Sequence, residues 1–381
     1  MKRREFLAAG CACGTLLAGA AAGAEWQMPA RLARPELATE EGGLWAMMDR
    51  AEVQLRRSPF TLRDPKLHDY VQDIACRLGA AHCPDIRVYL VQTPLFNANM
   101  APNGMMQVWT GLMLRVDNEA QLAAVIGHEI GHYLARHTLE HLRDVKSRSA
   151  FGQFLGLFGA AGAVGQLALL ASAFAYSRDQ EREADQIGVV LMRGAGYDPA
   201  EAGKVWDNLL LEIQAKPGGD PSRNPMFATH PSEEERRETL LRIAATAPGG
   251  VNNEDAWRQQ TAPFRRQWLK DEVKRGQHEE SLALLTRLIV HSPTRPEYFY
   301  ARGEVYRSRA GDKDLDSALA DYQAAIGLGG EPPETHRGLG LIQRQRMHAA
   351  EAKESFRRYL DAMPDAPDGP LIKSYLELLA Q

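Results

Sequence analysis

The sequence predicts an α+β protein that is mainly α-helical, with a small sheet in its first half and a solenoid of paired helices at its C-terminal end. Three observations support this prediction. A short alternating run at 85–91 is typical of a strand, long stretches keep apolar residues at helical spacing, and the last third of the chain repeats with a period of about 34 residues. A length of 381 residues favours two or three domains.

Composition indicates a globular chain and argues against one class of partner. Hydrophobic residues make up 44% of the sequence and charged residues 25%, which is ordinary for a folded protein. The formal net charge is −4, and no block of basic residues follows the first few positions. Because nucleic-acid phosphates are bound by basic faces, we expect no nucleic-acid partner.

Residues 1–24 predict an export signal that is not part of the fold. A positive run at 2–4 precedes a weakly apolar stretch at 6–22, and small residues at 22–24 allow cleavage. The sequence Arg-Arg-Glu-Phe-Leu at 3–7 resembles the core of the twin-arginine signal, and a general secretory signal is the alternative. Both readings predict an exported protein.

Two cysteines remain once the signal is removed. Cys76 and Cys83 lie seven positions apart, which is not a usual zinc spacing, and no further cysteine pair completes a set of four. In an oxidising compartment such a pair favours a disulfide over a metal site. We therefore predict a Cys76–Cys83 bridge.

The first elements are expected in the order helix, strand, turn and strand. Residues 45–80 are charged and helical in pattern, whereas three aliphatic residues alternate within 85–91 and predict a strand with one buried face. The sequence Pro-Asn-Gly at 102–104 predicts a turn, and the run at 106–110 follows as a second short strand.

A long helix is expected to begin after Asn118. Asparagine is a favoured N-cap, and Gln121 stands three residues later, as in a capping box. Apolar residues then keep helical spacing from Leu122 to Leu134. We expect the histidines beyond that point, His137 and His141, to be surface residues on the continuing helix.

Residues 151–176 contain no charged side chain and are long enough to span a bilayer. A single span would put the groups on either side of it on opposite sides of the membrane, whereas the site described below requires them together. We therefore expect buried or lid-forming helices here. Peripheral, reversible contact with a membrane is the alternative.

A Gly/Asn-rich segment predicts the boundary between two domains. This segment, at 246–262, is interpreted as a linker. It separates a first domain at 25–245 from a C-terminal domain at 263–381.

The C-terminal domain shows the tetratricopeptide pattern of paired helices. Units of about 34 residues begin at Pro296 and Pro333, and a more degenerate unit begins at Ala262. The alternative is a set of unrelated helical hairpins. Such hairpins would seldom repeat the same small and aromatic anchors in register, which are Gly303, Ala318 and Tyr322 in one unit and Gly340, Ala352 and Phe356 in the next.

The sequence His-Glu-Ile-Gly-His at 128–132 predicts a metal site. Residues four apart lie one above the other on a helix, so His128 and His132 present two imidazoles to one ion. Glu129 can then reach a water at the metal and act as a base, which is the chemistry of zinc hydrolases. Two flanking glycines, Gly127 and Gly131, each cost about 1 kcal/mol relative to alanine, which suggests that something approaches the helix closely. A surface helix with incidental histidines is the alternative.

A third ligand is expected from the sequence at 177–188. Glu181 and Asp185 are again four apart on one helical face, so Glu181 can complete the zinc sphere while Asp185 holds a ligand histidine by a hydrogen bond. Glu183 points roughly the other way and is not expected to bind the metal. Composition alone fits a solvated charged helix equally well, and the pairing of this stretch with the histidine motif favours the metal site.

These two motifs, in this order, resemble the zinc metallopeptidase family of the CAAX prenyl proteases and HtpX, and within it the BepA-like periplasmic branch with C-terminal tetratricopeptide repeats. The resemblance covers roughly residues 45–245 and implies a zincin-like metallopeptidase domain. It also implies that Asn97, Ala98 and Gly104 belong to an edge strand that aligns substrate, although Asn103 stands where the family has a glycine.

The resemblance implies roles for two further residues near the zinc. His230, in the sequence Thr-His-Pro at 229–231, could stabilise an oxyanion or close the open metal position in a resting state, and it could also be a helix-start histidine without a role in the site. Arg236 belongs to the same family motif.

The function implied is that of a periplasmic zinc endopeptidase in the quality control or assembly of outer-membrane proteins. Its expected substrates are unfolded or misassembled envelope proteins. The repeats would bind a protein partner, which could be the outer-membrane assembly machinery. The alternative from another class is a chaperone-like or adaptor protein whose zinc site is closed and inactive.

Overall fold

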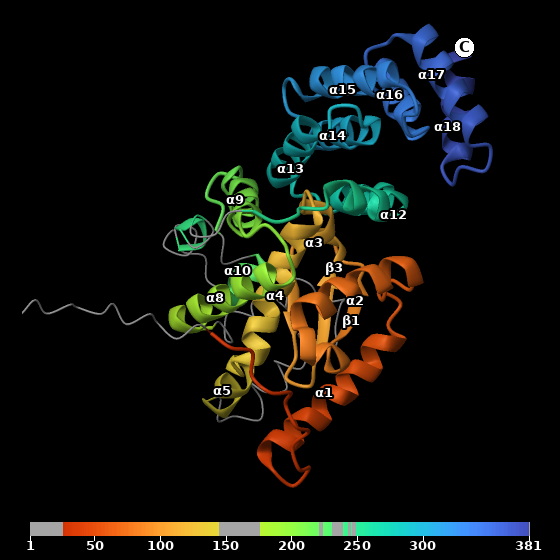
Figure 1. Cartoon of the computed structure of the whole chain (residues 1–381). Helices are drawn as coiled ribbons and strands as arrows, with labels where there is room; N and C mark the ends of the chain where they lie inside the picture. Colours follow the sequence, from red (N-terminus) through yellow and green to blue (C-terminus); the bar gives the residue numbers. More distant parts are fainter. Residues whose placement is uncertain are drawn as a thin grey trace, which may run out of the picture.

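The computed structural model describes residues 26–144, 176–220, 224–230, 239–242, 245 and 249–380. The expected export signal and nearly all of the uncharged segment at 151–176 lie outside these residues. Figure 1 shows one small sheet among the helices of the first part of the chain, with α13 to α18 lying beyond them, which confirms the mainly helical α+β fold. The helices are α1 (Glu40–Arg57), α2 (Pro65–Gly79), the 3-10 helix η1 (Ala80–Asp85), α3 (Thr110–Arg115), α4 (Glu119–Leu134), α5 (His137–Asp144), α8 (Arg178–Gly194), α9 (Ala200–Gln214), α10 (Pro225–Thr229), α12 (Glu254–Lys274), α13 (His278–His291), α14 (Pro296–Arg309), α15 (Asp314–Leu328), α16 (Glu334–Gln345), α17 (Ala349–Ala362) and α18 (Gly369–Ala380).

The described sheet has three strands in the order β1-β3-β2. Strand β1 (Arg87–Val91) runs parallel to β3 (Met105–Trp109), and β2 (Ala98–Met100) pairs antiparallel with β3 at the edge. Successive side chains on a strand face opposite sides, so the sheet can bury both of its faces. Helices α2 and α4 cover one face, and α1 covers the other.

The turn between β2 and β3 is held by a glycine and by a buried asparagine. Gly104 has φ +86°, and a Cβ at this position would lie 2.0 Å from the carbonyl oxygen of Asp85. The Asn103 side chain donates to carboxylates of α1, at 3.0 Å from Asp49 Oδ1 and 3.2 Å from Glu52 Oε2. Asn103, which stands where the family has a glycine, therefore connects the β2–β3 hairpin to α1.

A disulfide fixes the approach to the first strand. It joins Cys76 of α2 to Cys83 of η1, with an S–S distance of 2.01 Å. Strand β1 starts four residues after Cys83, so the bridge ties the end of α2 to the strand that follows.

Helices α4 and α8 approach each other more closely than side chains would allow. A Cβ on Gly131 would lie 2.8 Å from the carbonyl oxygen of Ala184, and a Cβ on Gly188 would lie 3.0 Å from the backbone nitrogen of His128. A Cβ on Gly127 would lie 3.2 Å from the carbonyl oxygen of Gly188. The close approach expected from the two flanking glycines is therefore a helix–helix contact, visible in Figure 1.

The C-terminal helices are attached to the first half of the chain by buried contacts. Helix α12 begins at Glu254, so the second part of the segment expected as a linker is helical. Its Trp257 is fully buried, and the indole nitrogen donates to the Val116 carbonyl oxygen at 3.1 Å. A truncation at residue 263 would therefore cut a packed helix. The division of the chain into domains stays a prediction.

A buried ionic cluster strengthens this attachment. The guanidinium of Arg115, at the end of α3, donates to Glu212 of α9 at 2.7 Å and to Glu272 of α12 at 2.9 Å. All three side chains are at most 4% exposed. Removing one member of such a cluster leaves a buried charge, which is strongly destabilising.

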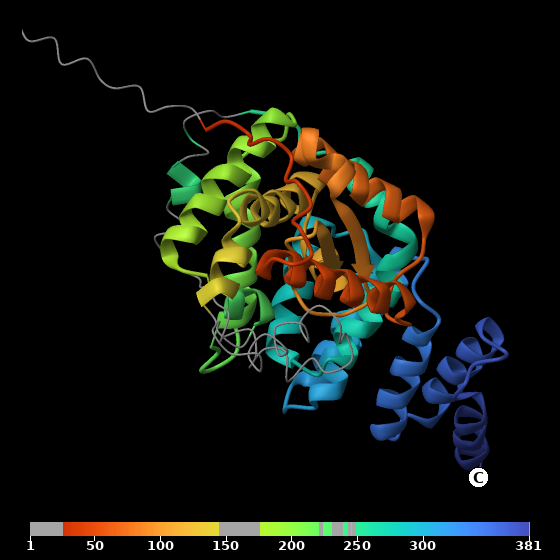
Figure 2. The same ribbon diagram turned by 90° about the horizontal axis from the view of Figure 1, so that it is seen from below.

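Beyond α13 the chain forms two helix pairs, α14 with α15 and α16 with α17. A Cβ on Gly303 would lie 2.7 Å from the ring of Tyr322, and one on Gly340 would lie 2.6 Å from the ring of Phe356. The same glycine–aromatic contact thus recurs in both pairs. Figure 2 shows the last helices extending away from the sheet-containing part.

We predict that Gly131→Ala lowers the thermal unfolding midpoint of the protein. Alanine favours an isolated helix by about 1 kcal/mol, but here its methyl group meets backbone that must move, and overpacking costs typically about 1–3 kcal/mol. The matched control is Gly43→Ala in α1, where an added Cβ meets nothing within 4 Å. Calorimetry should show a lower midpoint for Gly131→Ala only. A midpoint at or above that of the native protein would contradict the assigned contact.

Candidate metal centre

The histidine motif lies on the buried helix α4. Asn118 caps this helix, accepting from the Gln121 backbone N–H at 2.9 Å, which confirms the expected helix start. His128 and His132 are one turn apart and at most 2% exposed, and their Nε2 atoms lie 3.1 Å from each other. Both rings therefore turn the same nitrogen towards one point.

Helix α8 brings the carboxylate of Glu181 to that point. Ser177 and Gln180 form a capping box at its start, and the glycine contact with α4 sets its depth. Glu181 Oε1 lies 3.4 Å from His132 Nε2, and Glu181 Oε2 lies 3.5 Å from His128 Nε2. The carboxylate thus lies next to both histidines of the motif.

Asp185 contacts the other side of the first histidine. Its Oδ1 lies 2.9 Å from His128 Nδ1, and the carboxylate is buried. A proton on Nδ1 donates to Asp185 and leaves the lone pair of Nε2 facing the cluster, which is the arrangement of a metal-binding histidine. The structure places Asp185 where the sequence analysis expected it.

His230 completes the cluster from a third segment of the chain. It follows the short helix α10, and its backbone N–H donates to the Met226 carbonyl oxygen at 2.8 Å. Its Nδ1 lies 2.9 Å from Glu181 Oε1 and 3.1 Å from His128 Nε2. The described residues contain one group of this kind, whose donor atoms all lie within 4.8 Å of one another, namely His128, His132, Glu181 and His230.

The donor set fits zinc. Three imidazole nitrogens and a carboxylate oxygen are typical zinc ligands, and four such donors are enough for a tetrahedral site. Burial lowers the pKa of His132 well below its usual range, although Glu181 opposes that shift. His132 is therefore neutral near pH 7 and can offer a lone pair to the metal.

Glu129 lies beside the cluster and is not one of its four donors. It is 2% exposed, and its Oε1 lies 3.4 Å from His230 Nε2. Nδ1 of His230 therefore lies in the donor cluster, and Nε2 of the same ring lies next to Glu129.

An edge strand, β2, lies where the family resemblance implied one, its role towards substrate stays a prediction, and one expected residue lies outside the described part. Ala98 opens β2 and pairs with Val108, while the Asn97 carbonyl oxygen accepts from the Trp109 N–H at 3.1 Å. Gly104 occupies the turn at the other end of the hairpin. Arg236 is not among the described residues.

The expectation for His137 is wrong. Helix α4 ends at Leu134, and Arg136 adopts a left-handed φ of +62°, so the helix stops there and α5 begins as a separate helix at His137. His137 is 2% exposed, and its Nδ1 lies 3.0 Å from Nδ1 of His132. The side chain of His141 lies outside the described residues.

Sequence reasoning also missed Tyr176. Its ring stacks on the ring of His132, with centroids 3.9 Å apart, and its hydroxyl lies 2.7 Å from Thr138 Oγ1. An aromatic residue at the end of an uncharged segment carries no metal-site pattern, so only the folded chain reveals its place. Glu183 lies away from the four donors, next to His137, as its helical position suggested.

Comparison with known families decides between the metal site and an incidental cluster. Residues 61–244 match the family described as Peptidase family M48. The chain carries a peptidase family M48 domain. The family resemblance inferred from the sequence is therefore confirmed, and zinc is the metal of this domain. All four donors and Glu129 lie within the matched residues.

Relatives of the M48 domain occur in bacteria and in mitochondria. The chain is 36% identical over 171 residues to the mitochondrial metalloendopeptidase OMA1 of Arabidopsis thaliana, covering 44% of this chain and 34% of that protein. It is 30% identical over 240 residues to the beta-barrel assembly-enhancing protease of Yersinia pestis, covering 56% and 48%. The corresponding protease of Escherichia coli K12 is 27% identical over 226 residues, covering 53% and 45%. The chain thus spans about half or less of the length of these relatives.

We predict that Glu181→Ala and His132→Ala both lose bound zinc. Each change removes one donor from the buried cluster, whereas Asp179→Ala, two residues earlier on the same helix, alters a side chain that is 85% exposed and leaves all four donors in place. Metal analysis of the purified proteins measures the zinc-to-protein ratio directly. A ratio near one in Glu181→Ala would contradict the assignment of this carboxylate as a ligand.

Proposed function

We propose that this chain is an exported zinc metalloendopeptidase that acts on unfolded or misassembled envelope proteins. The observation that carries the proposal is the convergence of two motif histidines and a carboxylate from a second helix, with Glu129 beside them in an M48 domain. Relatives named metalloendopeptidase and beta-barrel assembly-enhancing protease support the same reaction class.

The reaction proposed is hydrolysis of a peptide bond. When bound, zinc supplies a Lewis acid that polarises the substrate carbonyl and makes water more acidic. Glu129 takes the proton from the attacking water and delivers it to the leaving amine. Asp185 holds His128 in the tautomer that leaves Nε2 available. The edge strand β2 offers backbone hydrogen bonds to an extended peptide, which would align it beside the site.

The position of His230 supports a resting state. Catalytic zinc sites keep three protein ligands and leave the fourth position for water or substrate, whereas here Nδ1 of His230 lies among the donor atoms. Displacement of this ring would open the site and free a donor that could stabilise the oxyanion. The same geometry is the one observation that favours the second candidate function, a chaperone-like or adaptor protein with a permanently closed zinc site.

The cellular setting is part of the proposal. An N-terminal twin-arginine or general export signal predicts the periplasm, and bacterial relatives named for beta-barrel assembly support an envelope role. Among the described residues, none of the helices combines the length and apolar character needed to cross a bilayer. Contact of 151–176 with a membrane surface stays a prediction, because that segment lies almost wholly outside the described part.

The C-terminal helices are proposed to be tetratricopeptide repeats that bind a protein partner. The recurring glycine–aromatic contacts in the pairs α14–α15 and α16–α17 support this assignment. Their buried attachment through Arg115 and Trp257 would hold a bound client at a fixed position relative to the metal centre. The outer-membrane assembly machinery is the partner that the bacterial relatives suggest.

We predict that Glu129→Gln retains zinc and loses proteolysis. The substitution keeps the shape of the side chain and the four donors, but the amide is a far weaker base than the carboxylate. Turnover of casein by the purified full-length chain should fall by about 10²–10⁴-fold at an unchanged zinc ratio. Native protein that binds zinc but does not cleave casein would favour the adaptor, and casein cleavage by Glu129→Gln at the native rate would remove the assigned base.

We predict that His230→Ala raises basal casein cleavage. Loss of the fourth donor opens a position for water, while three protein ligands keep the zinc in place. A fall in turnover of about 10²–10³-fold would instead assign His230 to oxyanion stabilisation. Unchanged zinc and unchanged cleavage would contradict both roles.

A further inference from the structure

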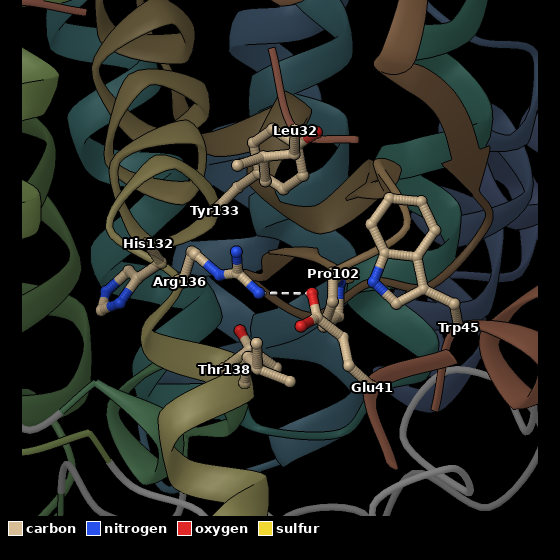
Figure 3. Close-up of a pocket in the computed structure, with 9 residues that line it drawn as sticks. Leu32, Glu41, Trp45, Pro102, His132, Tyr133, Arg136 and Thr138 are labelled. Carbon is tan, nitrogen blue, oxygen red and sulfur yellow. Dashed lines mark hydrogen bonds and ion pairs between the residues drawn. The ribbon is translucent and has the colours of Figure 1, made fainter. Parts of the chain in front are cut away.

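The turn after the histidine helix has a backbone conformation that asparagine or glycine would adopt more readily. Arg136 has φ +62°, and this break in the helix brings the first residue of α5 next to His132, near the end of α4. The Arg136 guanidinium forms an ion pair with Glu41 of α1, shown by the dashed line in Figure 3. Helix α1 precedes the residues matched by the family, so an element outside the M48 domain holds this turn.

The first residue of α5 contacts the outer nitrogen of the second motif histidine. His132 directs Nε2 towards the donor cluster, so its proton must lie on Nδ1 when it binds a metal. That N–H donates to Nδ1 of His137, 3.0 Å away. The remaining proton of His137 is then on Nε2, which lies 3.3 Å from Glu183 Oε2. With one tautomer for each histidine, the hydrogen bonds from His132 to His137 and from His137 to Glu183 can form together.

Thr138, the second residue of α5, holds the aromatic ring that stacks on His132. Thr138 Oγ1 lies 2.7 Å from the hydroxyl of Tyr176, and the Tyr176 ring stacks on His132 with an interplanar angle of 24°. The Tyr176 backbone N–H donates to the Thr229 carbonyl oxygen at 2.9 Å, next to His230. Figure 3 shows His132 and Thr138 on the same side of a small pocket whose other wall is Trp45.

We propose that His137 and Thr138 form a clamp that sets the tautomer and the ring plane of His132 and thereby raises zinc affinity. They are positioning residues, because neither is among the four donors. His137 accepts a hydrogen bond from Nδ1 of His132, as Asp185 does from Nδ1 of His128. A ligand that is already held in one tautomer and orientation loses less conformational freedom when the metal binds. The proposal rests on the proposed zinc function and assigns it two further residues.

The test compares two substitutions of similar size at position 137. His137→Leu fills the site but accepts no hydrogen bond, whereas the Oδ1 atom of His137→Asn can replace the accepting nitrogen. Zinc affinity of the full-length chain is measured by competition with a chromogenic chelator, together with the visible spectrum of the Co²⁺-substituted protein. We expect affinity about 10–100-fold lower with shifted Co²⁺ bands in His137→Leu, and values close to native in His137→Asn.

Two further variants complete the experiment. Thr138→Val removes the hydroxyl that holds Tyr176 while keeping the side-chain shape, and it should also lower zinc affinity. His348→Ala replaces an exposed histidine in the C-terminal helices and should leave affinity and spectrum unchanged. Native affinity and spectrum in both His137→Leu and Thr138→Val, or equal losses in His137→Leu and His137→Asn, would overturn the clamp. Failure of the native chain to bind zinc would instead overturn the proposed function itself.

Discussion

The close contact between α4 and α8 is the constraint on which the metal centre depends. Without side chains at Gly131 and Gly188, the backbones of the two helices approach until Glu181 lies beside both motif histidines and Asp185 beside the first. A helix pair separated by ordinary side chains would leave the carboxylates too far out. Glycine lowers the stability of a helix interior, but here it allows the close approach that places an acidic ligand against two imidazoles.

The surroundings of this helix pair hold the remaining groups in place. Strand β2 packs against α4, and the Glu41–Arg136 ion pair ties α1 to the turn that places the start of α5 beside His132. On the other side, Arg115 links α3 to α9 and α12 in a cluster shielded from water. The C-terminal helices are therefore joined to the metal-bearing part by buried charges that would be costly to separate.

Local patterns predicted the parts of the site that lie on regular helices. The spacing of four fixes the relation of His128 to His132 and of Glu181 to Asp185, and glycine beside the motif indicated a close neighbour. The break at Arg136 was not predictable, because neither glycine nor proline marks it and a tertiary contact with Glu41 holds its left-handed conformation. The start of α12 was missed for a related reason: a glycine- and asparagine-rich run ends at Asn253, and Trp257 is buried by residues distant in sequence.

The central claim is that three segments of the chain build one buried nitrogen and oxygen site for zinc. X-ray absorption at the zinc edge of the purified full-length protein tests it most directly. The account predicts one zinc per chain, with only nitrogen and oxygen ligands at about 2.0–2.1 Å and the outer scattering of three imidazole rings. A sulfur shell at about 2.3 Å, or an oxygen shell without imidazole, would contradict it.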